Sequence, residues 1–144
     1  MKRQAFSLVS LLTLLLVAGS AFAQTVHVRG NIPFNFAVGN KTLPAGTYDV
    51  RTISSGDSKT LLLRSRDSNA SIIVNSNAAE TLEPANNTKL VFNQYGNRYF
   101  LSQIWLSGST LGRQLPKSSR EKETARDLAQ DLTQGRVEIM ASLQ

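Results

Sequence analysis

The feature that most constrains the fold is a rhythm of short alternating runs between residues 25 and 111 of this 144-residue chain. Apolar and polar residues alternate within each run, and clusters of Gly, Asn, Asp and Ser separate the runs every eight to twelve residues or so. A period of two places alternate side chains on opposite faces of a β-strand. Regularly spaced short strands are typical of β-sandwiches and barrels. We therefore predict a mainly β fold, as a single antiparallel β-sandwich or flattened barrel of about seven to nine strands.

Turn residues and apolar positions give this prediction its detail. Gly46 follows Leu43-Pro44-Ala45 and offers the positive φ of a tight turn, and Tyr95-Gly96-Asn97 is expected to close a hairpin. A second hairpin loop is predicted around Gly56-Asp57, and the longest break in the pattern runs from 77 to 87. In the run 70–76, Ile72 and Val74 are expected on one face and Ile73 on the other. Apolar residues on both faces suggest a strand that is covered on both sides. The predicted core comprises Phe34, Phe36, Tyr48, Val50, Leu61, Leu63, Ile72, Val74, Leu90, Phe92, Phe100 and Ile104.

The rhythm changes after residue 112, so we divide the chain there into a β core (24–112) and a region packed on the same domain (113–144). Residues 112–117 have no clear period and are expected to form a linker. Ser118 and Glu121 have the spacing of a capping box, and Ala125, Leu128, Ala129 and Leu132 follow at helical spacing, which predicts one C-terminal amphipathic helix ending near Gly135. Residues 137–143 alternate again and favour a closing strand, with continuation of the helix as the alternative.

Residues 1–23 have the composition of a cleavable signal peptide. Lys2 and Arg3 precede the apolar run 8–18, and Ala21-Phe22-Ala23 supplies small residues for a signal peptidase. The apolar run is shorter than the roughly 20 residues that span a bilayer. We expect a protein that begins near Gln24, is secreted or periplasmic, and has no transmembrane segment after cleavage. With no cysteine, its stability is expected to come from core packing alone.

Charge and residue types narrow the chemistry. The formal net charge of the whole chain is +6, a modest and scattered excess that fits weak attraction to anionic envelope polymers and does not predict nucleic-acid binding. His27 is the single histidine of the chain. A metal site usually needs several His or Cys ligands, and a serine nucleophile usually needs a histidine base that is oriented by an acidic residue. We therefore predict no catalytic residues, no metal and no cofactor. Glu80 and Glu83 are expected in a solvated loop, with a cation site or a glycosidase pair as the alternative.

One strand carries the candidate ligand-binding residues Tyr99, Gln103 and Trp105. Alternate positions on a strand share a face, so an aromatic ring, an amide and an indole would line up as a platform for a sugar or another amphipathic ligand. The alternative is that both aromatic residues belong to the core. Four arginines on separate strands form either a basic patch or scattered solvated charges: Arg51, Arg64, Arg66 and Arg98.

Three stretches of the chain resemble a family of small secreted bacterial β-rich proteins to which no activity is assigned. The first is residues 32–48 (IPFNFAVGNKTLPAGTY). The second contains residues 89–92 (KLVF) and 95–101 (YGNRYFL), and the third is residues 112–118 (GRQLPKS) running into Glu121. The phrase LPAGTY is also similar to a turn-into-strand element of several extracellular β-sandwich domains. The resemblance implies a small exported β domain and carries no catalytic residue across.

These observations favour an exported, non-catalytic binding or structural module of the cell envelope or extracellular space, whose partner is a glycan or an anionic envelope polymer. Two alternatives belong to other classes. One is a carrier that encloses a small apolar ligand in a barrel-like cavity. The other is a hydrolase whose carboxylates, such as Asp49 or Glu80, meet only in three dimensions.

Overall fold

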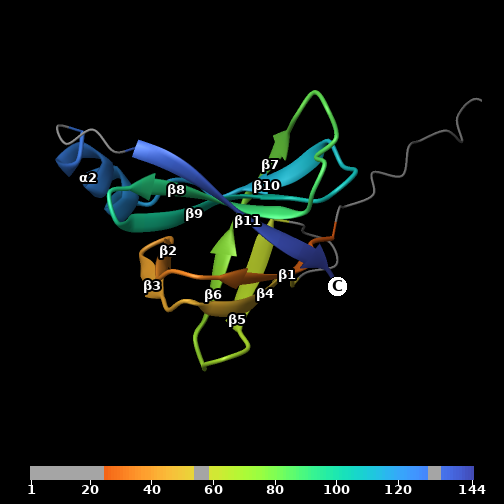
Figure 1. Ribbon diagram of the computed structural model, residues 1–144, viewed down its shortest axis with the longest axis horizontal. Helices are drawn as coiled ribbons and strands as arrows, with labels where there is room; N and C mark the ends of the chain where they lie inside the picture. The colour runs from red at the N-terminus through yellow and green to blue at the C-terminus, as the bar shows by residue number, and fades with distance from the viewer. Residues whose placement is uncertain (1–24, 54–58, 130–133) are drawn as a thin grey trace, which may run out of the picture.

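The computed structural model describes residues 25–53, 59–129 and 134–144. The predicted signal peptide 1–23, the predicted loop around Gly56-Asp57, and Leu132 of the expected helix lie outside the described residues. The described part of the chain is mainly β and forms a nearly closed, barrel-like sheet with one short helix (Figure 1). The mainly β prediction is confirmed at this level. None of the helices in the described ranges has the length and apolar character needed to cross a membrane.

Eleven strands and one helix make up the described elements. They are β1 (His27–Ile32), β2 (Phe36–Val38), β3 (Lys41–Leu43), β4 (Gly46–Thr52), β5 (Thr60–Ser65), β6 (Ser71–Asn75), β7 (Asn77–Glu80), β8 (Lys89–Tyr95), β9 (Arg98–Trp105), β10 (Leu111–Gln114), α2 (Ser119–Asp127) and β11 (Gln134–Leu143). The strand count exceeds our prediction because β7 and β10 form where the sequence suggested a break and a linker. Those two expectations are wrong for 77–80 and 112–114.

The strands pair in the order β3-β2-β9-β8-β11-β1-β4-β5-β6, and β10 pairs with both β9 and β7. Every pairing is antiparallel except the one between β2 and β9, which is parallel and joins Ala37 to Phe100. The described sheet is therefore mostly antiparallel, and this seam is its one parallel pairing. The β8–β9 hairpin is confirmed, and Gly96 at its turn has a φ of 60°.

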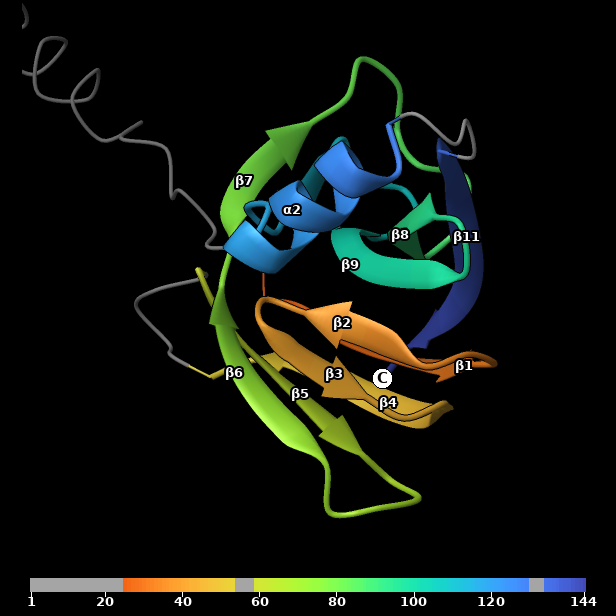
Figure 2. The same cartoon turned by 90° about the vertical axis from the view of Figure 1, so that its left-hand side faces the viewer.

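Two long segments curl the sheet toward closure, each by pairing with both halves. β11 pairs with β8 through residues 134–140 and with β1 through 141–143. The β6–β7 segment pairs with β5 through 71–75 and with β10 through 77–80. Figure 2 shows β6–β7 along one side and β11 along the other, joining the half that holds β1, β4 and β5 to the half that holds β8 and β9.

The bend between β6 and β7 is at Ser76, which is buried and heavily hydrogen-bonded. Its backbone N–H and its hydroxyl both donate to the carbonyl of Lys59, at 2.7 and 2.8 Å. Arg113 of β10 is 6% exposed and donates from Nε to Ser76 Oγ at 3.0 Å and from Nη2 to Ser76 O at 2.9 Å. A buried cation thus binds the polar backbone where the strand leaves one half of the sheet for the other.

The core cluster occupies the interior of the barrel and contains most of the predicted residues. Eight of these are buried in it: Phe36, Tyr48, Val50, Leu61, Leu63, Leu90, Phe92 and Ile104. Phe34, Ile72 and Val74 are partly buried against its margin. Ile73 is 61% exposed, so the predicted cover on both faces of β6 is wrong. Phe100 is buried in a second cluster with Ala37 and Tyr95, beneath Ala125 and Leu128 of the α2 region.

The helix is shorter than predicted and is not the last element. Ser118 is its N-cap, and its hydroxyl accepts a hydrogen bond from the Glu121 N–H at 3.1 Å, as the capping box requires. The helix ends at Asp127, and β11 follows, which confirms the closing strand and shows that continuation of the helix is wrong. β10 and β11 belong to the same sheet as the strands before residue 112.

Candidate functional site

An irregularity in β9 determines which of its side chains face outward. β9 pairs with β8 residue by residue, from Arg98 opposite Tyr95 to Leu101 opposite Phe92. The register then shifts, because the next residue of β8, Val91, lies opposite Gln103 and not opposite Ser102. Ser102 is therefore an extra residue on β9. An extra residue of this kind reverses the alternation of faces beyond it. Leu101 points into the core before Ser102, and Ile104 points into the core after it.

This reversal separates the three predicted ligand-binding residues. Tyr99 packs against the core margin and stacks on Phe34, with ring centroids 3.9 Å apart and planes 17° apart. Its hydroxyl accepts a hydrogen bond from Gln94 Nε2 at 3.3 Å. The structure therefore does not bring Tyr99 together with Gln103 and Trp105, whose side chains lie on the outer face. Simple alternation placed all three on one face because it assumed an unbroken strand.

Gln103 and Trp105 form a fixed pair on the outer face of β9. The indole Nε1 donates to Gln103 Oε1 at 3.1 Å. Trp105 lies opposite Gly112 of β10, and a Cβ added to that glycine would come within 2.6 Å of the indole Cε3. The indole therefore rests directly against the backbone of Gly112, which only a residue without a side chain allows.

A third strand completes the arrangement around Gln103. Arg136 of β11 donates from Nη2 to the same Gln103 Oε1 that accepts from Trp105. Two donors on one carbonyl oxygen fix the orientation of the amide, and no bond from its NH2 group to another described residue is found. Nearby, Lys89 of β8 and Glu138 of β11 form an ion pair at 2.8 Å.

Two adjoining hollows meet at Gln103 and Arg136, and we call them together the outer groove. One hollow has a volume of about 520 Å³ and extends toward the segment that leads into α2. The other has a volume of about 340 Å³ and lies between Trp105 and the loop 81–86. Besides the two shared residues, the polar lining of the first hollow comprises Asn93, Tyr95, Ser102, Gln114, Lys117 and Gln134. That of the second comprises Thr81, Glu83, Asn86, Lys89 and Glu138.

A buried carboxylate supports one end of the outer groove. Glu121 is 4% exposed, and its Oε1 accepts hydrogen bonds from Asn93 Nδ2 at 2.8 Å and from the Tyr95 hydroxyl at 3.1 Å. The carboxylate thus holds Asn93 and Tyr95, which line the groove, instead of completing the capping box. Burial raises the pKa of the Tyr95 phenol, and the neighbouring Glu121 charge raises it further.

The buried tyrosines predict a loss of stability at high pH. Tyr48 is fully buried and donates to the Pro44 carbonyl at 2.7 Å, and burial raises its pKa as well. The stability that the neutral phenols of Tyr48 and Tyr95 contribute is fully present below the unperturbed pKa of 10.0 and is lost as pH rises through the raised values. Urea midpoints measured across this range should fall more steeply for the natural chain than for a Tyr48→Phe/Tyr95→Phe variant. Equal slopes would contradict the prediction.

The other sequence-predicted residues lie on different faces. Asp49 accepts hydrogen bonds from Arg29 at 2.6 Å and Arg66 at 3.1 Å, and the Arg29 bond is the main reason that its pKa is lowered. The carboxyl group is therefore held ionised and is poorly suited to act as a general acid near neutral pH. A small hollow of about 130 Å³ on β1, β4 and β5 is lined by His27, Asp49, Arg51, Leu62 and Arg64.

Three of the four predicted arginines therefore gather around Asp49, namely Arg51, Arg64 and Arg66, whereas Arg98 lies near α2 and donates to Thr124 Oγ1. Glu80 is on β7 and pairs with Leu111, while Glu83 lines the outer groove. Among the residues that the structure describes, no group of three or more His, Cys, Asp or Glu side chains is placed to hold a metal ion.

Sequence reasoning identified Gln103 and Trp105 but missed the partners that orient them. Arg136 bonds Gln103, and Asn93 and Lys117 line the same hollow, but all three come from segments whose proximity depends on strand order, which the alternating pattern does not encode. Gly112 carried a weak signal, because a glycine in a strand often marks a close approach by a neighbour. Comparison with protein-family models, with curated proteins and with solved structures finds no match for this chain. The family resemblance of the three stretches stays a prediction.

Proposed function

We propose that this protein is an exported, non-catalytic binding module of the cell envelope or extracellular space, and that it binds a glycan chain in the outer groove. The observation that carries the proposal is the oriented pair of Trp105 and Gln103. The half-buried indole is backed by Gly112 and held by Gln103, which Arg136 fixes in turn. Ordering of these side chains before a ligand arrives lowers the entropic cost of binding.

The chemistry of the lining suits a polyhydroxylated ligand. An aromatic ring offers a flat apolar surface to the C–H face of a sugar ring, and the indole N–H keeps a polar partner. Side-chain amides both donate and accept hydrogen bonds, as sugar hydroxyls do, and five of them line the groove: Asn86, Asn93, Gln103, Gln114 and Gln134.

Charge in the groove favours glycans that carry acidic groups. Three cations line it, Lys89, Lys117 and Arg136, against the two carboxylates Glu83 and Glu138. Lys89 is neutralised by its ion pair with Glu138. Arg136 and Lys117 remain in the larger hollow, where no carboxylate is part of the lining. An acidic polysaccharide fits this balance better than a neutral one.

The first test is an array of neutral and uronate-containing oligosaccharides probed with the chain that begins near Gln24, followed by calorimetry on the sugars that bind. Trp105→Ala should weaken binding about tenfold, equivalent to roughly 1.4 kcal/mol. Gly112→Ala should also weaken it, because the new Cβ would clash with the indole; it would also come within 2.7 Å of the Ile104 carbonyl oxygen, so circular dichroism must show that this variant keeps its fold. Ile73→Ala, which truncates an exposed apolar side chain on β6, is the matched control and should bind normally. Unchanged binding by both groove variants would contradict the proposal.

A hydrolase is the second candidate, because Glu83 and Glu138 line the same hollow as Trp105. Two carboxylates beside a bound sugar are the usual equipment of glycoside hydrolysis. Turnover of a bound oligosaccharide that is abolished by Glu83→Gln or Glu138→Gln would favour this candidate over the binding module. The carrier alternative has less support, since buried side chains of the core cluster occupy the barrel interior.

A further inference from the structure

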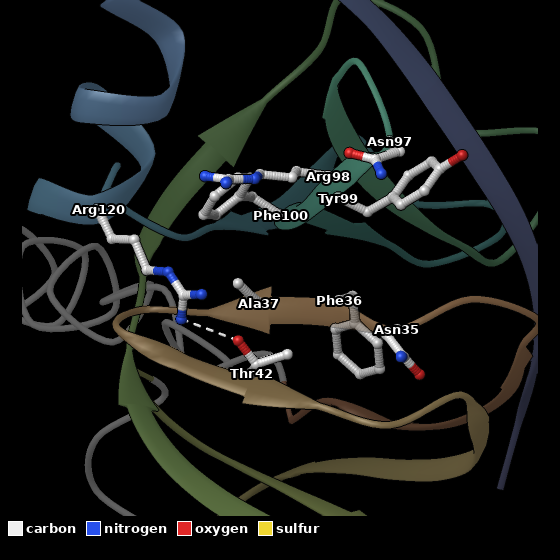
Figure 3. A pocket seen from close by; sticks show the side chains of 9 residues that line it. All are labelled: Asn35, Phe36, Ala37, Thr42, Asn97, Arg98, Tyr99, Phe100 and Arg120. Atoms are coloured by element: carbon white, nitrogen blue, oxygen red, sulfur yellow. Dashed lines mark hydrogen bonds between the residues drawn. The ribbon is translucent and has the colours of Figure 1, made fainter. Parts of the chain in front are cut away.

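A second pocket opens on another part of the molecule, at the seam where β2 and β3 meet β9. Along one edge of β9, Phe100 pairs with Ala37 of β2, and this is the single register pair between the two strands. Further along the same edge, residues 103–105 of β9 pair with β10. Among the strand pairings of the described residues, the one between β2 and β9 is the shortest. A pocket of about 190 Å³ lies there, and we call it the seam pocket (Figure 3).

The seam pocket combines an apolar lining with two cationic side chains. Its apolar lining comes from Phe36, Ala37, Tyr99 and Phe100, and its polar lining from Asn35, Thr42, Asn97, Arg98 and Arg120. Figure 3 shows Arg120 reaching from α2 toward Thr42, and Arg98 extending along the β9 side above it. Both guanidinium groups lie at the end of the pocket near the helix, whereas Asn35 and Asn97 lie toward the other end.

The two arginines are bonded to neutral partners. Arg120 Nη1 donates to Thr42 Oγ1 at 2.8 Å, and Arg98 Nη1 donates to Thr124 Oγ1 at 3.3 Å. The ion pairs found within the described ranges involve Arg29, Arg66 and Lys89, and not these two residues. Each guanidinium carries five N–H donors in a planar fork that matches a carboxylate or phosphate. Hydroxyl partners position the side chains without cancelling their charge.

We propose that the seam pocket binds a small amphipathic anion, with a ring-sized apolar body against Phe36 and Phe100 and one carboxylate or phosphate between Arg98 and Arg120. The volume fits this class, because an apolar cavity of about 150 Å³ accommodates benzene. The charged end of the ligand replaces water on the two guanidinium groups with charge-assisted hydrogen bonds. The site shares no lining residue with the outer groove and does not depend on the proposed glycan binding.

The experiment is an NMR titration of the labelled chain, beginning near Gln24, with benzoate and phenyl phosphate as probes. The amides of Ala37, Phe100 and Arg120 should shift, and benzoate should bind about tenfold more tightly than the uncharged benzyl alcohol. Acetate, which has the charge without the ring, should also bind more weakly than benzoate. The relative affinities of benzoate and phenyl phosphate identify which acidic group the pocket prefers.

Three variants make the test specific. Arg98→Gln and Arg120→Gln should each weaken benzoate binding by about tenfold, because each removes one fork of charged donors. Lys122→Gln removes the same charge from an exposed position on the same helix and should leave binding unchanged. Trp105→Ala should also bind benzoate normally, so that failure of the glycan proposal is distinguishable. Equal affinity for benzoate and benzyl alcohol, equal loss in the Lys122 control, or shifts confined to the Arg51 and Arg64 face would each overturn the proposal.

Discussion

Replacing Phe92 with alanine is expected to lower the free energy of unfolding by about 3–5 kcal/mol, as is usual for the loss of a buried aromatic ring. Phe92 is fully buried, and its ring makes edge-to-face contacts with Phe34 and Phe36 at centroid distances of 5.2 and 5.5 Å. It also pairs across the sheet with Val137 on one side and Leu101 on the other. The variant therefore leaves a cavity between three strands and removes two aromatic contacts.

Urea unfolding, followed by circular dichroism, measures the effect. Phe92→Leu is the matched control and should cost clearly less, because leucine retains most of the buried volume and all of the apolar character. A loss below about 1 kcal/mol for the alanine variant would show that the core is not centred where the structure places it.

Replacing Arg113 with methionine should destabilise the protein by about 2–3 kcal/mol, even though methionine fills much of the same space. The change removes the donors to Ser76 Oγ and Ser76 O at the bend between β6 and β7. Leaving a buried carbonyl without its donor costs about 1–3 kcal/mol. The loss should be accompanied by faster hydrogen exchange in β7, because the bend joins β7 to β6 and Arg113 holds the bend from β10.

Arg113→Lys tests whether the hydrogen bonds or the charge matter more. A lysine can reach with one ammonium group but lacks the planar fork that serves Oγ and O together, so we expect only partial recovery. Equal stability of the methionine variant and the natural chain, with unchanged exchange in β7, would show that the buried arginine does not support the closure of the barrel.

Much of the architecture could be predicted because local patterns and tertiary packing agree. The alternation of Val137, Ile139 and Ala141 predicted a strand, and these side chains do pack on the core from β11. Gly96 and Ser118 were identified from the chemistry of turns and caps, which depends on few neighbours. Phe100 was correctly expected to be buried, but it lies under the helix and not in the main core.

The features that escaped prediction depend on long-range pairing. The alternation rule treats every strand as regular, and nothing about Ser102 marks it as the extra residue in β9. β7 contains two alanines and little β-branched character, so its pairing with β10 decides its conformation. Glu121 has the spacing of a capping box, yet Asn93 and Tyr95 take its carboxylate.

The candidate site was half predicted for the same reason. Gln103 and Trp105 stand two residues apart and share a face on any regular piece of strand, so their association is local. Arg136 can reach Gln103 because β9 and β11 lie on the two sides of the same strand, β8. The outer groove is thus a product of strand order, which the sequence pattern left open.

Fluorescence of Trp105 tests the central claim most directly, because it is the single tryptophan of the chain and lines the outer groove. The measurement is acrylamide quenching of the purified protein, with and without a uronate-containing oligosaccharide. If a sugar ring covers the indole, quenching should be efficient in the free protein and clearly reduced at saturating oligosaccharide, with a shift in the emission maximum. Binding detected by calorimetry with no change in either quenching or emission would contradict the assignment of Trp105 to the glycan site.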